Sequence, residues 1–183
     1  MNEQHPFLID GHLDLSMNAM EWNRDLRISI TELNRREEGM TDKPDRAKAT
    51  VTFEELRKGN IGLVVATQIA RYVAPGSTLP GWLSPEQAWA QTQGQLAWYK
   101  AMEEDGHMRM ICTREQLDAH IAEWTNGTDN TNNPIGYILS LEGADSMINL
   151  RYVEKAYGYG LRRSVLHIMV PVGTQMVQML REN

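Results

Sequence analysis

Phe7-Leu8-Ile9-Asp10-Gly11-His12-Leu13-Asp14-Leu15 is the stretch from which the rest of the chain can be interpreted. Its apolar start predicts a buried strand over residues 7–9, which Gly11 interrupts. Because side chains two positions apart in a strand share one face, His12 and Asp14 are expected to point the same way. An imidazole and a carboxylate at the end of a strand suit a divalent ion such as zinc. The alternative is a hydrogen-bonded core histidine next to an aspartate that caps a helix or a turn.

The composition predicts one soluble globular domain. The chain has 183 residues, of which 42% are hydrophobic and 23% charged, and this length normally forms one domain with a core. A net charge of −6 without a basic patch argues against nucleic acid and against an anionic membrane surface. Cys112 is the only cysteine, so no intrachain disulfide forms and a reducing compartment fits. Residues 1–6 do not resemble a signal peptide and no apolar run has the length of a membrane span, so we expect a cytoplasmic protein.

Apolar, β-branched runs alternate with helical patterns along the rest of the chain. Four further strands are predicted: Ile61–Ala70, Met108–Cys112, Pro134–Gly143 and Ser164–Val170. Four helices are predicted from capping residues and terminal glycines: Thr52–Gly59, Ser84–Gly106, Thr113–Trp124 and Tyr152–Tyr159. Strands that alternate with helices predict right-handed crossovers and a parallel sheet. Ser16 to Thr50 has no clean period and is predicted as a long excursion with some helix.

This order of elements fits two α/β architectures, an open doubly wound sheet and a (β/α)8 barrel. No glycine-rich phosphate loop follows the first strand, which counts against the nucleotide-binding doubly wound sheet. A complete barrel needs at least about 200 residues, and only four or five strands are predicted here. The predicted fold is therefore α/β, the amino-terminal half of a (β/α)8 TIM-type barrel like those of metal-dependent hydrolases, and incomplete.

Glu142 ends a predicted strand, as His12 and Asp14 do. In a parallel barrel the carboxyl ends of the strands lie at one rim, so the three side chains are expected to meet there. A carboxylate can bridge two metal ions, and a two-metal site can activate a water molecule for hydrolysis. The alternative for Glu142 is an acid at a helix N-terminus, where the helix dipole stabilises it.

Four short motifs occur in an order that resembles one enzyme family: Ile9-Asp10-Gly11-His12-Leu13-Asp14, Glu55-Leu56-Arg57-Lys58-Gly59-Asn60-Ile61-Gly62, Ser140-Leu141-Glu142-Gly143-Ala144-Asp145 and Tyr159-Gly160-Leu161-Arg162. Together they resemble the amino-terminal half of the renal (membrane) dipeptidase family of zinc peptidases, in its bacterial soluble branch. The resemblance covers about residues 7–163. It implies a (β/α)8 barrel with a binuclear zinc site that hydrolyses dipeptides by metal-activated water.

The resemblance also implies roles for individual residues. His12 and Asp14 resemble ligands of one zinc ion, and Glu142 resembles the carboxylate that bridges both ions. Asp10 and Asp145 are candidates to orient these ligands, with a helix cap as the alternative for Asp145. The family's two histidines on later strands and its catalytic acid have no counterpart in this chain, so only partial zinc binding is expected. Dipeptides are the expected substrates, no nucleic-acid or membrane partner is expected, and a homo-oligomer stays open.

The tail departs from the resemblance after Arg162. Suppose that the gene is read in a shifted frame, in which each codon takes the last base of one original codon and the first two bases of the next. In that frame the codon that spans Met169 and Val170 must encode glycine, and so must the codon that spans Met176 and Val177. These glycines are seven positions apart, as in the family pattern. We therefore predict a partial metallodipeptidase barrel domain over residues 1–162 and a non-family tail over residues 163–183 that results from a frameshift.

Two functions follow from the sequence. The first is a zinc metallodipeptidase by resemblance, with little or no activity in the truncated chain because later ligands are missing. The second is a non-catalytic α/β fragment or binding module in which the three candidate ligands are structural. His107 and His120 are predicted to be solvated, and Cys112, which has no nearby base in sequence, is predicted to be a buried, inert thiol.

Overall fold

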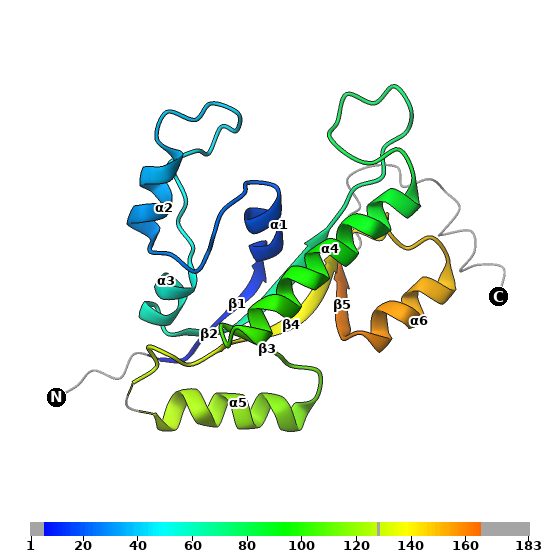
Figure 1. Cartoon of the computed structure of the whole chain (residues 1–183). Helices are drawn as coiled ribbons and strands as arrows, with labels where there is room; N and C mark the ends of the chain where they lie inside the picture. The colour runs from blue at the N-terminus through cyan, green and yellow to red at the C-terminus, as the bar shows by residue number, and fades with distance from the viewer. Residues whose placement is uncertain (1–5, 128, 166–183) are drawn as a thin grey trace.

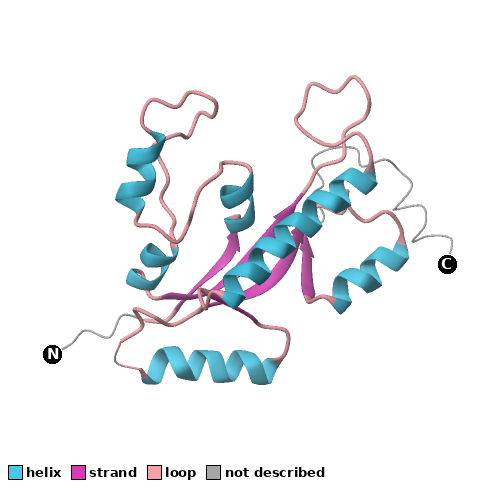
Figure 2. Ribbon diagram, in the orientation of Figure 1, coloured by secondary structure: helices cyan, strands magenta, loops and turns pink. Residues whose placement is uncertain are grey.

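The structure, a computed structural model, describes residues 6–127 and 129–165 as one parallel sheet flanked by helices (Figure 1, Figure 2). The strands are β1 (Leu8–Leu13), β2 (Ile61–Ile69), β3 (Met108–Met110), β4 (Ile135–Glu142) and β5 (Leu161–Val165). The helices are α1 (Leu15–Met20), α2 (Ile30–Glu37), α3 (Phe53–Lys58), α4 (Pro85–Glu104), α5 (Arg114–Asn126) and α6 (Leu150–Gly158). The predicted α/β class and the alternation of strands with helices are confirmed.

The sheet has five strands, and all the pairings between them are parallel. β1 pairs with β2, and β2 pairs with β4 over seven residues that end with Ile69 opposite Glu142. The other edge of β4 is shared, because β3 pairs with residues 135–137 and β5 with residues 139–142. Four strands therefore follow one path, β1-β2-β4-β5, while β3 lies beside the beginning of β4.

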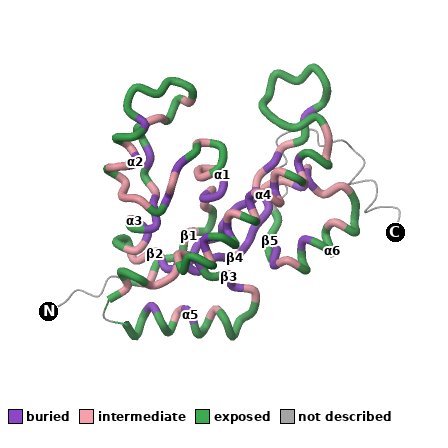
Figure 3. The backbone as a smooth tube through the Cα atoms, viewed as in Figure 1, coloured by how far each residue is buried: buried purple, intermediate pink, exposed green. Residues whose placement is uncertain are grey.

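The core lies against the two central strands, which are buried on both faces as parallel strands usually are. Val64 and Ala66 of β2 belong to the same buried cluster as Tyr99 of α4, whose ring stacks on Tyr137 of β4 with 5.1 Å between centroids. Leu63, which points to the opposite face of β2, is buried as well. Figure 3 shows the buried residues concentrated along the middle of the sheet.

Three predicted helix starts are confirmed by side-chain caps. Thr52 caps α3 and Ser84 caps α4, each by accepting a hydrogen bond from the backbone N–H three residues later. Thr113 and Gln116 form a complete capping box at α5. Each cap satisfies a donor that the first helical turn leaves without a partner, so these helices begin where the sequence predicts.

The prediction of a buried strand over residues 7–9 is wrong in its burial. β1 begins at Leu8, and Leu8 and Ile9 are 45% and 57% exposed. Among the described residues β1 pairs only with β2, so its outer edge has no neighbouring strand. An apolar run predicts a strand, but it does not distinguish a central strand from an edge strand.

The prediction that His107 and His120 are solvated is wrong for both. His120 of α5 is buried, with its Nε2 atom 2.7 Å from the carbonyl oxygen of Gly62 and 3.1 Å from the backbone nitrogen of Gly136. A Cβ atom at Gly136 would lie 2.5 Å from that Nε2 atom, so glycine makes room for the ring. His107 is half-buried and stacks on Phe53 with 5.0 Å between ring centroids. The facing residues, which sequence pattern does not reveal, decide the burial of both rings.

The excursion over residues 16–50 includes α2 and is closed by a buried ion-pair network. Glu37 accepts hydrogen bonds from Arg24 (2.8 and 3.0 Å), from Arg46 (2.8 Å) and from the backbone N–H of Ala47 (2.8 Å). The three charged side chains are no more than 9% exposed. These hydrogen bonds, above all those from Arg24, lower the pKa of Glu37 to about 2. A segment without sequence periodicity is thus fixed by charge pairing.

The last described strand, β5, bears on the predicted domain boundary at residue 163 and on the predicted strand over residues 164–170. β5 crosses the predicted domain boundary at residue 163, and the predicted strand over residues 164–170 begins earlier, at Leu161. The rest of that predicted strand and the predicted tail lie, from residue 166 onward, outside the described residues. Within residues 6–127 and 129–165, no helix combines the length and apolar character that crossing a membrane would need.

His120 is expected to make the folded state less stable in acid. Burial lowers the pKa of His120 below its ordinary value of 6.5. The unfolded chain therefore takes up a proton at a pH at which the folded chain does not, so this contribution is complete above about pH 6.5 and is lost as the pH falls below it. Urea denaturation between about pH 7.5 and pH 5.5 measures the slope. His120→Gln should flatten it, and an unchanged slope would contradict the assignment.

Glu37→Ala is expected to lower the free energy of unfolding by about 3 kcal/mol, because it leaves the buried guanidinium group of Arg24 without a carboxylate and leaves Arg46 with Asp42 alone. Glu32→Ala, on the same helix, is the matched control. Glu32 pairs with Arg35 and Arg36, which are 65% and 56% exposed, and such surface pairs contribute less than about 1 kcal/mol. Equal losses in the two variants, measured by urea denaturation, would show that the network does not hold the excursion.

Candidate metal centre

The carboxyl ends of β1 and β4 bring together the three candidate ligands. His12 lies on β1, Asp14 follows it directly, and Glu142 is the last residue of β4. His12 Nε2 lies 3.0 Å from Glu142 Oε2 and 3.5 Å from Asp14 Oδ1. One donor atom from each of the three residues lies within 4.8 Å of the other two. The structure therefore places these side chains together, although β2 separates their strands.

The cluster is partly buried and accessible from solvent. The exposed fractions of the side chains are 44% for His12, 28% for Asp14 and 18% for Glu142. An exposure of 44% excludes the alternative that His12 is a core histidine with its hydrogen bonds satisfied inside the protein. An ion could reach the three donors, and the partial burial reduces the competition from water.

β2 determines the orientation of Asp14. Its Oδ1 atom accepts a hydrogen bond from the hydroxyl group of Thr67, a residue that is completely buried. Asp14 occupies the N-cap position of α1, but its side chain makes no capping hydrogen bond. Asp14 is therefore the N-cap residue of α1 by position, but its carboxylate is turned toward His12 and Thr67 instead of toward the helix.

The backbone after Glu142 turns away from the sheet at once. Gly143 has a φ angle of +79°, a left-handed conformation that glycine adopts without a steric penalty. The next helix, α6, begins eight residues later and is capped by Asn149. Glu142 is therefore not an acid at a helix N-terminus, and the alternative predicted for it is wrong.

Asp10 and Asp145 lie next to the ligands in sequence. Asp10 Oδ1 accepts a hydrogen bond of 2.9 Å from the backbone N–H of His12, so it supports the backbone that carries the imidazole. Asp145 is half-buried in the turn that follows Glu142. It does not cap a helix, because Asn149 caps α6.

Arg163 is a residue of this region that the sequence analysis missed. From β5, its guanidinium group donates a hydrogen bond of 2.7 Å to the carbonyl oxygen of Gly11, the neighbour of His12. The side chain therefore reaches from the last strand of the four-strand path to the first. The sequence analysis assigned residue 163 to a tail outside the domain, and no motif connected it to β1.

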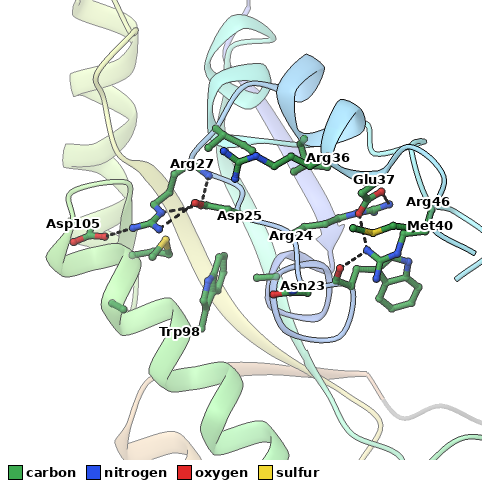
Figure 4. Close-up of a pocket in the computed structure, with 16 residues that line it drawn as sticks. Asn23, Arg24, Asp25, Arg27, Arg36, Glu37, Met40, Arg46, Trp98 and Asp105 are labelled. Carbon is green, nitrogen blue, oxygen red and sulfur yellow. Dashed lines mark hydrogen bonds and ion pairs between the residues drawn. The ribbon is translucent and has the colours of Figure 1, made fainter. Parts of the chain in front are cut away.

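A hollow of about 580 Å³ lies between the excursion and α4 (Figure 4). Trp98 forms part of its wall, and its charged groups pair with one another, as Arg27 does with Asp25 and Asp105. None of the three candidate ligands lines it. Because its charges are already satisfied within the protein, the hollow shows no preference for a ligand class, and the cluster on β1 and β4 is the better functional site.

Comparisons with known proteins agree with the fold. No protein-family model and no curated protein matches the sequence. Among solved structures, the chain is similar to the crystal structure of the dipeptidase AC, a metallopeptidase of family M19, with a TM-score of 0.54, 16% identity and coverage of 88% of this chain and 42% of that chain. The chain shares its fold with part of this M19 structure. A crystal structure of the probable dipeptidase PvdM from Pseudomonas aeruginosa is similar with a TM-score of 0.54 and 12% identity, covering 95% of this chain and 44% of that chain.

The solved structures are similar to this chain in fold, and they are more than twice as long as the part that matches. The M19 structures are of the TIM-barrel type, and the chain spans less than half the length of either structure. At 12–16% identity the likeness concerns the fold alone. The chemistry depends on the cluster itself, whose imidazole nitrogen and two carboxylates form a donor set that suits zinc and related divalent ions.

Proposed function

We propose that this chain is the metal-binding part of a metallodipeptidase of the M19 type, with His12, Asp14 and Glu142 as zinc ligands. The observation that carries the proposal is the convergence of one imidazole and two carboxylates within 4.8 Å, at the carboxyl ends of parallel strands. Active sites of TIM-type barrels lie at this end of the strands, and the solved structures with this fold are named as dipeptidases.

The neighbouring residues support a bound ion. Thr67 would hold the carboxylate of Asp14 and Asp10 the backbone of His12, and such outer contacts commonly fix the orientation of metal ligands. A carboxylate such as Glu142 can bridge two ions. When bound, a divalent ion polarises a peptide carbonyl group and activates water for hydrolysis. Dipeptides are the substrate class that we propose.

The strand path supports the interpretation as half of a (β/α)8 barrel. β1, β2, β4 and β5 follow one another in a single parallel path, and the complete barrel has eight strands. The later histidines and the catalytic acid that the family resemblance implies have no counterpart here. We propose that the chain by itself binds metal and hydrolyses dipeptides slowly or not at all.

A non-catalytic module is the second candidate function. The distance of 3.0 Å between His12 and Glu142 favours it, because a protonated imidazole can pair with a carboxylate and fix the ends of two strands without a metal ion. The two functions differ in whether the stability of the chain depends on a metal.

Zinc is expected to raise the melting temperature of the purified chain. A ligand that binds only the folded state stabilises it by about 2.7 kcal/mol at 100 times its Kd, and 1 kcal/mol corresponds to roughly 2–4 °C in a chain of this size. Scanning fluorimetry in zinc and in EDTA measures the shift. Glu142→Gln should remove most of it, whereas Glu86→Gln, at the exposed start of α4, should preserve it. A shift that is the same in both variants, or absent from the native chain, would favour the non-catalytic module.

Dipeptide hydrolysis by the zinc-loaded chain is expected to stay at the level of the buffer blank, because only part of the family's ligand set is present. Release of free amino acids from a panel of dipeptides, followed by chromatography, measures it. His12→Ala is the control. Turnover in the native chain that disappears in His12→Ala would show that the described ligands suffice and would refute the proposed inactivity.

A further inference from the structure

We propose that Arg71, two residues after the end of β2, binds the free carboxylate of a peptide whose last peptide bond lies at the metal cluster. Arg71 would then make the site selective for substrates that end one residue beyond the bond to be hydrolysed. This inference rests on the proposed function, because it takes the cluster to be the place where the substrate reacts.

Two hydrogen bonds show which way successive side chains of β2 point. The hydroxyl group of Thr67 bonds to the carboxylate of Asp14, so one face of the strand is directed to the metal cluster. The next side chain, Gln68, donates a hydrogen bond to the carbonyl oxygen of Thr92 on α4, so the other face is directed to the helix. Because side chains two positions apart in a strand share one face, the row that starts at Thr67 leads to Arg71.

Arg71 is the member of this row that lies beyond the level of the cluster. The row passes through Ile69, which lies opposite Glu142. The intervening Ala70 is buried, which agrees with a side chain directed to the helix. Two residues of extended chain advance by roughly 7 Å, and the long arginine side chain can bend back over this interval. One residue of a substrate spans roughly 3.5 Å, so a carboxylate at that distance from a peptide bond at the cluster lies within reach of the guanidinium group.

The loop that joins β2 to α4 (Figure 1) holds the backbone of Arg71 in place. The carbonyl oxygen of Arg71 accepts a hydrogen bond of 2.8 Å from the backbone N–H of Trp82, and the backbone N–H of Val73 donates one of 2.8 Å to the carbonyl oxygen of Trp82. A Cβ atom at Gly81 would lie 2.9 Å from the carbonyl oxygen of Arg71, so the two branches of the loop pack closely here. A side chain on a fixed backbone loses less entropy when it binds a ligand.

The guanidinium group of Arg71 is available for an anion. Arg71 is half-buried, and within residues 6–127 and 129–165 its guanidinium group forms neither a hydrogen bond nor an ion pair. All five of its N–H donors can therefore serve a ligand. Arg163 is the less suitable cation, because it already donates to the carbonyl oxygen of Gly11 and lies opposite Ser140, before the end of β4. Arg71 lies beyond the carboxyl ends of the strands, the side from which substrates enter sites of this type.

The chemistry of the cluster leaves the end of a dipeptide without a partner. The three candidate ligands offer two carboxylates and one imidazole, and none of them would attract a substrate carboxylate once a metal ion is bound. A guanidinium group pairs with a carboxylate through two parallel hydrogen bonds, which are roughly twice as strong as those between neutral groups. A C-terminal amide, or a further residue, would place a neutral group at Arg71 and lose this gain.

The first test compares the binding of alanyl-leucine and of its C-terminal amide to the native 183-residue chain, by NMR titration in zinc and in EDTA. We expect the dipeptide to bind at least about tenfold more tightly than the amide in zinc. Arg71→Gln should abolish this preference. Arg71→Lys should restore part of it, because lysine keeps the charge but not the paired donors. Arg114→Gln, whose side chain is 88% exposed on α5, is the matched control and should change nothing.

Three results of this test would overturn the proposal. The first is an equal affinity of the native chain for the dipeptide and its amide. The second is a preference for the dipeptide that survives in Arg71→Gln. The third is the absence of measurable dipeptide binding by the zinc-loaded chain.

The second test needs no variant, so it does not depend on whether Arg71→Gln folds. Phenylglyoxal modifies guanidinium groups, and mass spectrometry of the digested chain gives the rate at each arginine. Alanyl-leucine at about ten times its Kd should slow the modification of Arg71 about tenfold by mass action and leave that of Arg114 unchanged. The amide at the same concentration should protect neither. Equal rates at Arg71 with and without the dipeptide would refute the proposed contact.

Zinc titration of the same samples lets the two proposals fail separately. Zinc binding without a carboxylate preference that depends on Arg71 refutes this inference and leaves the proposed function standing. A carboxylate preference that depends on Arg71 in a chain that binds no zinc supports the anion site and refutes the proposed function. If both proposals hold, native chain and Arg71→Gln bind zinc equally, and only the native chain distinguishes the dipeptide from its amide.

Discussion

The parallel pairing of β2 with β4 is the constraint on which the rest of the structure depends. Its seven residue pairs place strands side by side that are separated in sequence by two helices and a short strand. Both strands are buried on both faces, so their register is fixed by packing and by backbone hydrogen bonds alike. The pairing ends with Ile69 opposite Glu142, while Thr67 lies opposite Ser140, two residues before Glu142. This register sets the height of Glu142 relative to β2, and the pairing of β1 with β2 sets the heights of His12 and Asp14.

The same pair of strands explains how α5 is fixed to the sheet. His120 inserts between the glycines of β2 and β4, Gly62 and Gly136, and Nε2 contacts the backbone of both. Nε2 can donate to the carbonyl oxygen of Gly62 or accept from the backbone N–H of Gly136, and the tautomer of the ring decides which of the two bonds forms. Among the described residues, Nδ1 is buried without a hydrogen-bond partner. The helix is thus oriented by a neutral imidazole.

Local signals in the sequence predicted the elements, and only the neighbours in space determined their burial. Caps such as Thr113 act within four residues, so the starts of helices could be predicted from the sequence. The exposure of Ile9 depends on whether a strand lies beyond β1, and the burial of His120 depends on glycines in two other strands. The three candidate ligands could be identified because motif and strand ends coincide. Arg163 could not, because its contact with Gly11 spans 152 positions of sequence.

The charge of the cluster itself argues for a cation at this place. Asp14 and Glu142 direct two carboxylates toward one point, with donor atoms within 4.8 Å, and two negative charges at that distance repel by about 3–4 kcal/mol at an effective dielectric constant of about 20. The fold keeps the two carboxylates together in spite of this repulsion. The hydroxyl group of Thr67 holds Asp14 by a hydrogen bond, and the position of Glu142 at the end of β4 holds the second carboxylate. One imidazolium could offset a single carboxylate, whereas a divalent ion offsets both and bonds to the imidazole as well. Two carboxylates held close together by separate strands therefore support the proposal of a shared ion over a purely structural role.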